Sequence, residues 1–181
     1  PHTEITGINH RDDRITAITT AQGETISCDH LIIAGGAWTA RCGQWLNLTL
    51  PITPLKGQIL ALRQPSTPLR HLIFGEAIYL APKGDGTILV GATKEEVGFD
   101  KDLTAGGISW LLNSAIKLAP ALQQSSVERM WAGLRPKSPD GLPIIGPAPG
   151  WENVMLASGH GSVGILLSGL TGQMITDMFV K

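Results

Sequence analysis

The sequence has only two cysteines, Cys28 and Cys42, and neither lies in a Cys-x-x-Cys or His-x-His pattern. We therefore expect no zinc or other metal site and no disulfide framework, and we predict reduced thiols in a cytoplasmic protein. No stretch has the uninterrupted apolar length of a membrane span, and the first residues lack the pattern of a secretion signal. We accordingly predict no membrane association.

Neither sign of charge is in excess, because 14 lysines and arginines accompany 15 acidic side chains without a run of like charge. This excludes the basic footprint typical of nucleic-acid binding, so the expected ligand is a small molecule or another protein. The chain also lacks a Gly-x-Ser-x-Gly elbow and a pair of carboxylates placed for acid and base catalysis. Hydrolytic and metal-dependent reactions are disfavoured, and we assign no catalytic side chain.

What the sequence does have is an apolar content of 43%, enough for a sizeable core. Residues 3–30 alternate short β-rich runs with polar turns, which predicts a three-stranded antiparallel meander. The run "LIIAGG" at 31–36 differs, since continuous apolar residues predict a strand buried on both faces of a parallel sheet. Its paired glycines precede a helix that we expect to begin near Trp38, and a strand end of this kind forms a crevice suited to a ligand.

A second, largely antiparallel sheet is predicted after residue 50, with "KGDGT" at 83–87 as a hairpin turn. Residues 103–122 have helical spacing, with Thr104 as the cap and Pro120 as the stop. A returning strand follows at 126–136, then a loop, a strand at 153–161 and a final helix from about 162. Because the chain begins at Pro1 inside a predicted strand, without methionine, we expect an excised piece of a longer protein.

Arg135 lies in "ERMWAGLRP", beside Met130 and Trp131, which we predict to be interior. A buried guanidinium requires a carboxylate partner, because an unpaired buried charge costs several kcal/mol. The partner could be a structural carboxylate such as Glu128 or Asp140, or the carboxylate of a ligand held by the arginine fork. The residues alone leave both alternatives open.

Three further side chains have both an ordinary and a functional interpretation. Tyr79 is the only tyrosine, and strand alternation directs it away from the face of Ile78 and Leu80. Without other information Tyr79 is a sheet-surface residue, Lys94 a solvated turn residue, and His160 a turn or core histidine. The glycine-rich "SGHGSVGILLSG" is likewise either a tight turn or a turn that lets a ligand approach a helix start.

The order of the motifs is more specific than any one of them: "LIIAGGAW", "PLKGQILAL", "YLAPKGDGTILVGAT", "WAGLRPKSPDGLPIIG" and "ASGHGSVGILLSG". This series resembles the C-terminal half of the flavin-dependent D-amino-acid oxidase family, most closely its glycine oxidase members of the thiamine pathway. The resemblance implies an α+β and α/β fold: a partial FAD-binding Rossmann-type domain at 1–50 and 137–181, and an antiparallel-sheet substrate domain at 51–136.

The resemblance also implies a site. In glycine oxidases the arginine of "AGLRP" binds the substrate carboxylate. The resemblance therefore implies that Arg135 orients an amino acid over the flavin, and that Tyr79 lies beside the same carboxylate. Ser162 stands where these enzymes commonly carry a further arginine, and Lys94 stands where relatives carry an apolar residue, so Lys94 could supply replacement charge or merely point to water. The implied FAD contacts are Ile5, Gly35, Gly36, His160, Gly161, Ser162, Val163, Gly164, Ile165 and Leu166.

The implied reaction is oxidation of a small amino acid or amine to an imine, with dioxygen as the acceptor and hydrogen peroxide as a product. The family's Gly-x-Gly-x-x-Gly fingerprint on the first strand-helix unit is missing in that context, so we expect this chain alone to be inactive and to bind FAD weakly or not at all. The alternatives are a non-catalytic binding module or separate subunit for small carboxylates and, within the family, a sarcosine or D-amino-acid oxidase or dehydrogenase. A homo-oligomer of the complete protein is left open.

Overall fold

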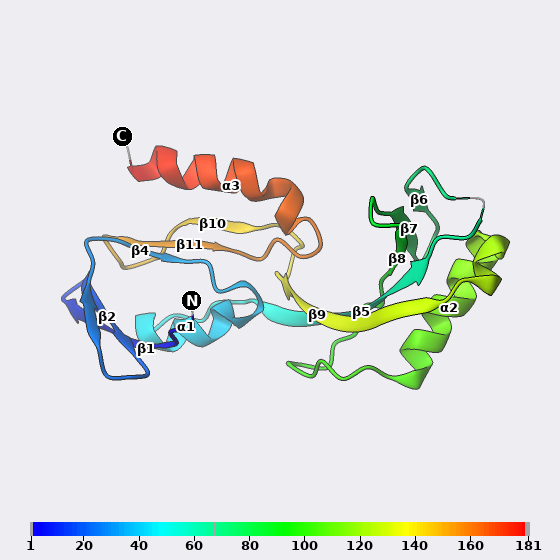
Figure 1. Ribbon diagram of the computed structural model, residues 1–181. Coiled ribbons are helices and arrows are strands. Elements are labelled where there is room, and N and C mark those ends of the chain that lie inside the picture. Colours follow the sequence, from blue (N-terminus) through cyan, green and yellow to red (C-terminus); the bar gives the residue numbers. More distant parts are fainter. Residues whose placement is uncertain (1, 67, 180–181) are drawn as a thin grey trace. The chain divides into compact units, whose positions relative to one another are not determined.

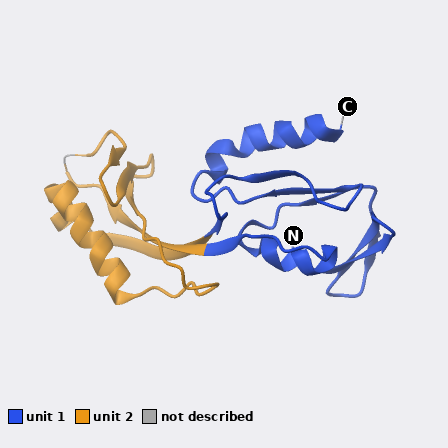
Figure 2. Ribbon diagram, turned by 180° about the vertical axis from the view of Figure 1, so that it is seen from behind, with its two compact units in different colours: residues 1–54, 135–181 blue, residues 55–134 orange. Residues whose placement is uncertain are grey.

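The computed structural model describes residues 2–66 and 68–179, which form two compact units (Figures 1 and 2). Unit 1 comprises residues 1–54 and 135–181, and unit 2 comprises residues 55–134. The chain passes between the units twice, after Pro54 and after Leu134.

Unit 1 begins with the antiparallel meander of β1 (Ile5–Arg11), β2 (Arg14–Thr20) and β3 (Thr25–Ser27), as predicted. Its second sheet has the order β10–β11–β4, from β10 (Ile144–Pro147), β11 (Val154–Ser158) and β4 (Leu31–Ile33). β11 runs parallel to β4 and antiparallel to β10. The strand β10 was not predicted, because "PIIG" is short and follows a loop rich in proline and glycine.

Helices lie on both sides of this second sheet (Figure 1). A single 3₁₀ turn, η1 (Gly36–Trp38), leads into α1 (Thr39–Leu46), and α3 (Gly164–Phe179) follows β11. The helix α3 packs on β10 and β11. The edge strand β4 is less covered, so Ile32 is 45% exposed. The prediction that residues 31–34 are buried on both faces is therefore wrong for Ile32 and for Ala34, which is also exposed.

The core of unit 1 joins the meander, the second sheet and α1 through Ile15, Ile33, Leu46, Val154 and Leu156. A buried asparagine, Asn153, fixes the two sheets to each other. Its Nδ2 donates to the carbonyls of Ile15 (2.8 Å) and Asp29 (2.6 Å), and its Oδ1 accepts from the Ile15 amide (2.9 Å). The two bonds to Ile15 satisfy buried backbone groups, and the bond to Asp29 satisfies a partly buried one.

Unit 2 is a five-stranded sheet covered by a helix. The strand order is β6–β7–β8–β5–β9, from β5 (Thr53–Arg63), β6 (Ile73–Phe74), β7 (Tyr79–Pro82), β8 (Thr87–Gly91) and β9 (Val127–Lys137). The helix α2 (Ala105–Leu118) buries Leu111 and Ala115 against Leu60, Leu80 and Ile88. A 3₁₀ segment, η2 (Pro120–Gln124), follows α2.

The predicted boundaries of α2 and of the hairpin are confirmed. The hydroxyl of Thr104 accepts from the amide of Gly107 (3.1 Å), and the helix stops two residues before Pro120. In the hairpin, Asp85 accepts hydrogen bonds from the hydroxyl and the amide of Thr87, which lower the pKa of Asp85.

Both cysteines are free thiols, half-buried in unit 1, and burial raises the pKa of Cys42. Within residues 2–66 and 68–179, no helix is long and apolar enough to cross a membrane.

Candidate functional site

The carboxyl ends of β4 and β11 lie at one edge of the second sheet of unit 1, because the two strands are parallel. The segment after β4 is fixed to β11 by two hydroxyl groups. Ser158 Oγ donates to the Gly36 carbonyl (3.1 Å), and Thr39 Oγ1 donates to Ser158 Oγ (2.8 Å). Thr39 and Ser158, each 2% exposed, escaped sequence reasoning because isolated hydroxyl residues carry no pattern.

The turn between β11 and α3 contains Gly159, Gly161 and Gly164, which have the Gly-x-Gly-x-x-Gly spacing. This spacing stands at the last strand-helix unit of the chain, and sequence reasoning overlooked it there. A Cβ at Gly159 would lie 3.1 Å from Ile52 and 3.3 Å from Ser138, so a side chain there would have to displace its neighbours. Both Gly159 (φ +82°) and Gly161 (φ +55°) have left-handed backbones that favour glycine.

The end of β9 reaches the same turn. The amide of Gly161 donates to the carbonyl of Pro136 (2.8 Å), and Lys137 forms an antiparallel bridge with His160. Arg135 therefore directly precedes Pro136, which is bonded to Gly161, and Ser162 directly follows Gly161. Two of the predicted substrate residues, Arg135 and Ser162, are thus brought to neighbouring positions of the backbone in unit 1.

The surroundings of Arg135 are more open than predicted. Met130 is 44% exposed, and Arg135 and Trp131 are half-buried rather than interior, because β9 is an edge strand of its sheet. The two carboxylates considered as partners have bonds of their own. Glu128 accepts from Arg63 Nε (2.6 Å), and Asp140 accepts from the Leu142 amide (3.0 Å).

The remaining predicted FAD contacts of unit 1 differ in their environment. His160 Nε2 is bonded to Thr171 Oγ1 (2.9 Å), so the imidazole fixes the turn to α3. Ile165 and Leu166 are 94% and 82% exposed, so the start of α3 presents an exposed apolar surface. Ile5 opens β1 of the meander, a different sheet from the one that carries the glycine turn.

Tyr79 lies in unit 2, opposite Gly91 of β8. As predicted, Ile78 and Leu80 are buried in the core while Tyr79 is half-buried on the other face. A Cβ at Gly91 would lie 2.8 Å from Cε1 of the tyrosine ring and closer still to the phenol oxygen. Gly91, which sequence reasoning did not single out, therefore provides the space in which the Tyr79 ring lies.

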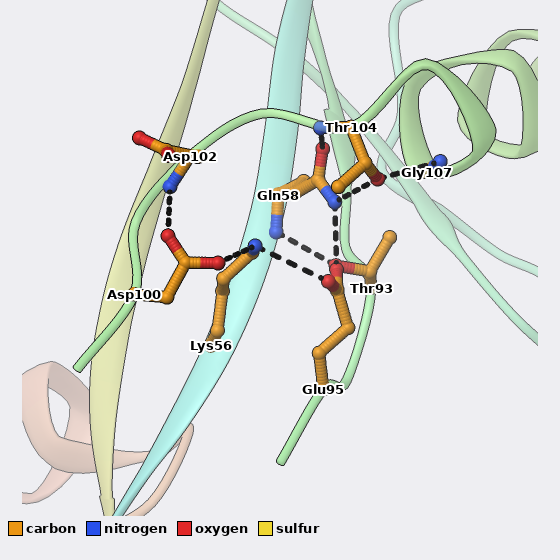
Figure 3. A network of polar contacts seen from close by, with 8 residues as sticks. All are labelled: Lys56, Gln58, Thr93, Glu95, Asp100, Asp102, Thr104 and Gly107. Carbon is orange, nitrogen blue, oxygen red and sulfur yellow. Dashed lines mark hydrogen bonds and ion pairs between the residues drawn. The ribbon is translucent and has the colours of Figure 1, made fainter. Parts of the chain in front are cut away.

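Lys94 is exposed and stands between two residues of a polar network that the sequence did not reveal (Figure 3). The centre of this network is Lys56, which is 1% exposed and whose Nζ lies 3.4 Å from Glu95 Oε2 and 3.3 Å from Asp100 Oδ2. Gln58, fully buried, donates from Nε2 to Glu95 Oε1 (2.8 Å) and to Thr104 Oγ1 (2.9 Å).

The charged groups of this network stabilise one another's ionised forms. Burial alone would lower the pKa of Lys56, but the hydrogen bonds and charges of Asp100 and Glu95 outweigh burial and raise it. Burial opposes ionisation of Glu95 as well, but hydrogen bonds from Thr93, Gln58 and Lys56 lower its pKa. The Asp102 amide and Lys56 lower the pKa of Asp100, so all three charged groups are held in their ionised forms.

Comparison with known proteins shows the family of the chain. Residues 1–178 match the sequence model of the family described as FAD dependent oxidoreductase (DAO). The chain belongs to this family. A glycine oxidase of Pseudomonas putida is 38% identical over 177 residues, which cover 98% of this chain and 48% of that protein. Hydrogen cyanide synthase subunit HcnC of Pseudomonas protegens is also 38% identical, over 98% of this chain and 43% of its own length.

Among solved structures, the crystal structure of glycine oxidase from Geobacillus kaustophilus is similar, with a TM-score of 0.90 and 36% identity. The match covers 97% of this chain and 47% of that chain. The DAO-type fold, with part of an FAD-binding domain and an antiparallel sheet, is thereby confirmed. The chain spans about half the length of the relatives it matches.

FAD is the cofactor of this family, and unit 1 has features that suit it. A Cβ at Gly36 or Gly161 would meet no atom within 4 Å, so the backbone at both glycines is open to a close approach. At the start of α3, the amides of Gly164, Ile165 and Leu166 precede the first bonds within the helix, and they lie at the positive end of its dipole. The part of FAD that each residue contacts stays a prediction.

Proposed function

We propose that this chain is the substrate-side portion of a flavin-dependent amine oxidase that oxidises glycine or a related small amino acid. Unit 1 would hold part of FAD and, through Arg135 and Ser162, the substrate carboxylate. The observation that supports the proposal best is the bond between Gly161 and Pro136 (2.8 Å), because it joins the strand of Arg135 to the glycine turn assigned to the flavin. A substrate bound by Arg135 would then lie beside the cofactor.

The residues of the chain would orient the substrate. Arg135 would bind its carboxylate through two parallel hydrogen bonds, and Ser162 would add one neutral hydrogen bond. Bound FAD would supply the redox chemistry, the oxidation of the amine to an imine with dioxygen as the final acceptor. The free amides at the start of α3 would stabilise negative charge that develops nearby. No side chain needs to act as a base.

The test is steady-state kinetics of the complete flavoprotein with Arg135→Ala, following peroxide release. A charge-assisted hydrogen bond contributes about 1.5–3 kcal/mol, so KM for the amino acid should rise about 10- to 150-fold. Arg135→Lys should restore part of the affinity, because it keeps the charge without the fork. Arg129→Ala is the matched control, since Arg129 lies on the same strand and its guanidinium covers the Trp131 ring at 4.8 Å. An unchanged KM in Arg135→Ala rules out the carboxylate role.

The similarity to HcnC, a hydrogen cyanide synthase subunit, supports a second candidate: a subunit of a larger enzyme with a different product. Product analysis separates the two. Ammonia and hydrogen peroxide in equal amounts support the oxidase, and cyanide supports the second candidate. A chain that binds small carboxylates but carries no FAD when complete would favour the non-catalytic module.

A further inference from the structure

The last residues of β9 are bonded one after another to the glycine turn between β11 and α3. The carbonyl of Pro136 accepts from the amide of Gly161 (2.8 Å), and Lys137 forms an antiparallel bridge with His160. Ser138, which is buried, continues the attachment, because its Oγ donates to the carbonyl of the first glycine of the turn (3.3 Å). The backbone is therefore fixed to the turn on both sides of Lys137.

Lys137 shares a face of β9 with Arg135. Both residues belong to unit 1, and both are half-buried. Side chains two positions apart on a strand point to the same face, about 7 Å from each other along the strand. His160 lies on this face as well, since opposite residues of an antiparallel pair project to the same side. Two cationic groups thus stand side by side where β9 meets the glycine turn.

The turn and the helix that follow β11 add no negative side chain to this region. The sequence has no acidic residue between Glu152 and Asp177, and the first turn of α3 has none. The amides at the start of α3 form the positive end of the helix dipole. On the strand side, the nearest acidic residues in the sequence are Glu128 and Asp140, which have the bonds described above. The junction is therefore a positive region, suited to a ligand with more than one negative group.

We propose that Lys137 is a specificity-determining residue, which binds a second carboxylate of the substrate while Arg135 binds the carboxylate next to the reacting carbon. The substrate class is then a small amine that carries two carboxylates. This inference rests on the proposed function and narrows it, because one guanidinium is enough for the single carboxylate of glycine. A substrate with two carboxylates pairs both cations, and pairing offsets the cost of holding two like charges on a half-buried face.

Two substrates that differ by one carboxylate test the inference in the complete flavoprotein. Sarcosine carries a methyl group on the nitrogen of glycine, and iminodiacetate carries a carboxymethyl group there. The kcat/KM for iminodiacetate should exceed that for sarcosine at least tenfold, and in Lys137→Met this ratio should fall at least tenfold, as expected for one charge-assisted hydrogen bond. Lys137→Arg should keep the preference. Arg14→Met is the matched control, since it removes the same charge from an exposed ion pair of unit 1.

Three results would overturn the inference. The first is an equal kcat/KM for the two substrates in the parent protein. The second is an equal loss for both in Lys137→Met, which would give Lys137 a structural role only. The third is weaker FAD binding with an unchanged ratio, which would place Lys137 at the cofactor. If Lys137→Met fails to bind FAD, Lys137→Gln decides through the same ratio, because it keeps a polar side chain without the charge.

Failure of this inference is distinguishable from failure of the proposed function. Oxidation of sarcosine without a preference for iminodiacetate refutes the role of Lys137 alone. Oxidation of neither substrate, nor of glycine, refutes the proposed function and this inference with it.

Discussion

Gly107 and Gly106, neighbours in the first turn of α2, should respond in opposite ways to the same substitution. A Cβ at Gly107 would lie 2.7 Å from Cδ and 2.9 Å from Oε1 of Gln58, and closer still to Nε2. A Cβ at Gly106 would meet no atom within 4 Å. Gln58 is fully buried and bonded through both ends of its amide, so it cannot move aside without losing hydrogen bonds.

The magnitudes follow from general values. Alanine is favoured over glycine in a helix by about 0.5–1 kcal/mol, so Gly106→Ala should stabilise the protein by about this amount. In Gly107→Ala two costs outweigh the same gain. Overpacking costs about 1–3 kcal/mol, and loss of the buried hydrogen bonds of Gln58 costs about 1–3 kcal/mol. We expect Gly107→Ala to lose about 2–4 kcal/mol, or roughly 5–15 °C in Tm.

Thermal and denaturant unfolding of both variants, followed by circular dichroism, measures this difference. If Gly107→Ala were as stable as Gly106→Ala, the reasoning would be refuted, since Gln58 would then not occupy the space beside the helix start. A crystal structure of Gly107→Ala would show whether the segment 93–104 has shifted.

Three further results are expected. Gly91→Ala should place a methyl group against the tyrosine ring of β7 and destabilise unit 2 by about 1–3 kcal/mol, whereas Gly133→Ala, with open space at its Cβ, should be nearly neutral in the same unfolding assay. Asn153→Ala should lose about 2–4 kcal/mol, because two buried backbone groups of Ile15 and the partly buried carbonyl of Asp29 lose their partner, and a loss below 0.5 kcal/mol would contradict the assigned role. The Asp102 amide and Lys56 lower the pKa of Asp100, so the stabilisation is present above its ordinary pKa of about 4 and is lost as pH falls through the lowered value. Asp100→Asn should therefore lose less stability than the parent protein between about pH 5 and pH 2, and parallel pH profiles would argue against the ion pair.

Local patterns in the sequence predicted much of the fold, because strands, caps and turns depend on nearby residues. The meander, the hairpin at 83–87, and the cap and stop of α2 are examples. The strand β10 escaped prediction because its four residues are defined by pairing with β11, not by their own composition. The exposure of Ile32 likewise depends on which strands flank β4.

The candidate site was predictable only in part, for a related reason. Arg135 and the glycine turn stand out in the sequence, but the bond that joins them links residues 136 and 161. Lys56 and Gln58 looked like ordinary residues of an alternating strand, since nothing in "LKGQILAL" indicates that Glu95, Asp100 and Thr104 approach them. Long-range polar contacts of this kind have no local signal.

The central claim is that this chain forms the substrate side of an amino-acid-oxidising flavoenzyme. The most direct measurement is anaerobic mixing of the complete, FAD-loaded protein with glycine, sarcosine and D-alanine in turn, while the visible absorbance of the flavin is recorded. The account predicts bleaching by at least one of these amines, and return of the colour with peroxide release when air is admitted. A flavin spectrum that remains oxidised with all three amines would contradict it.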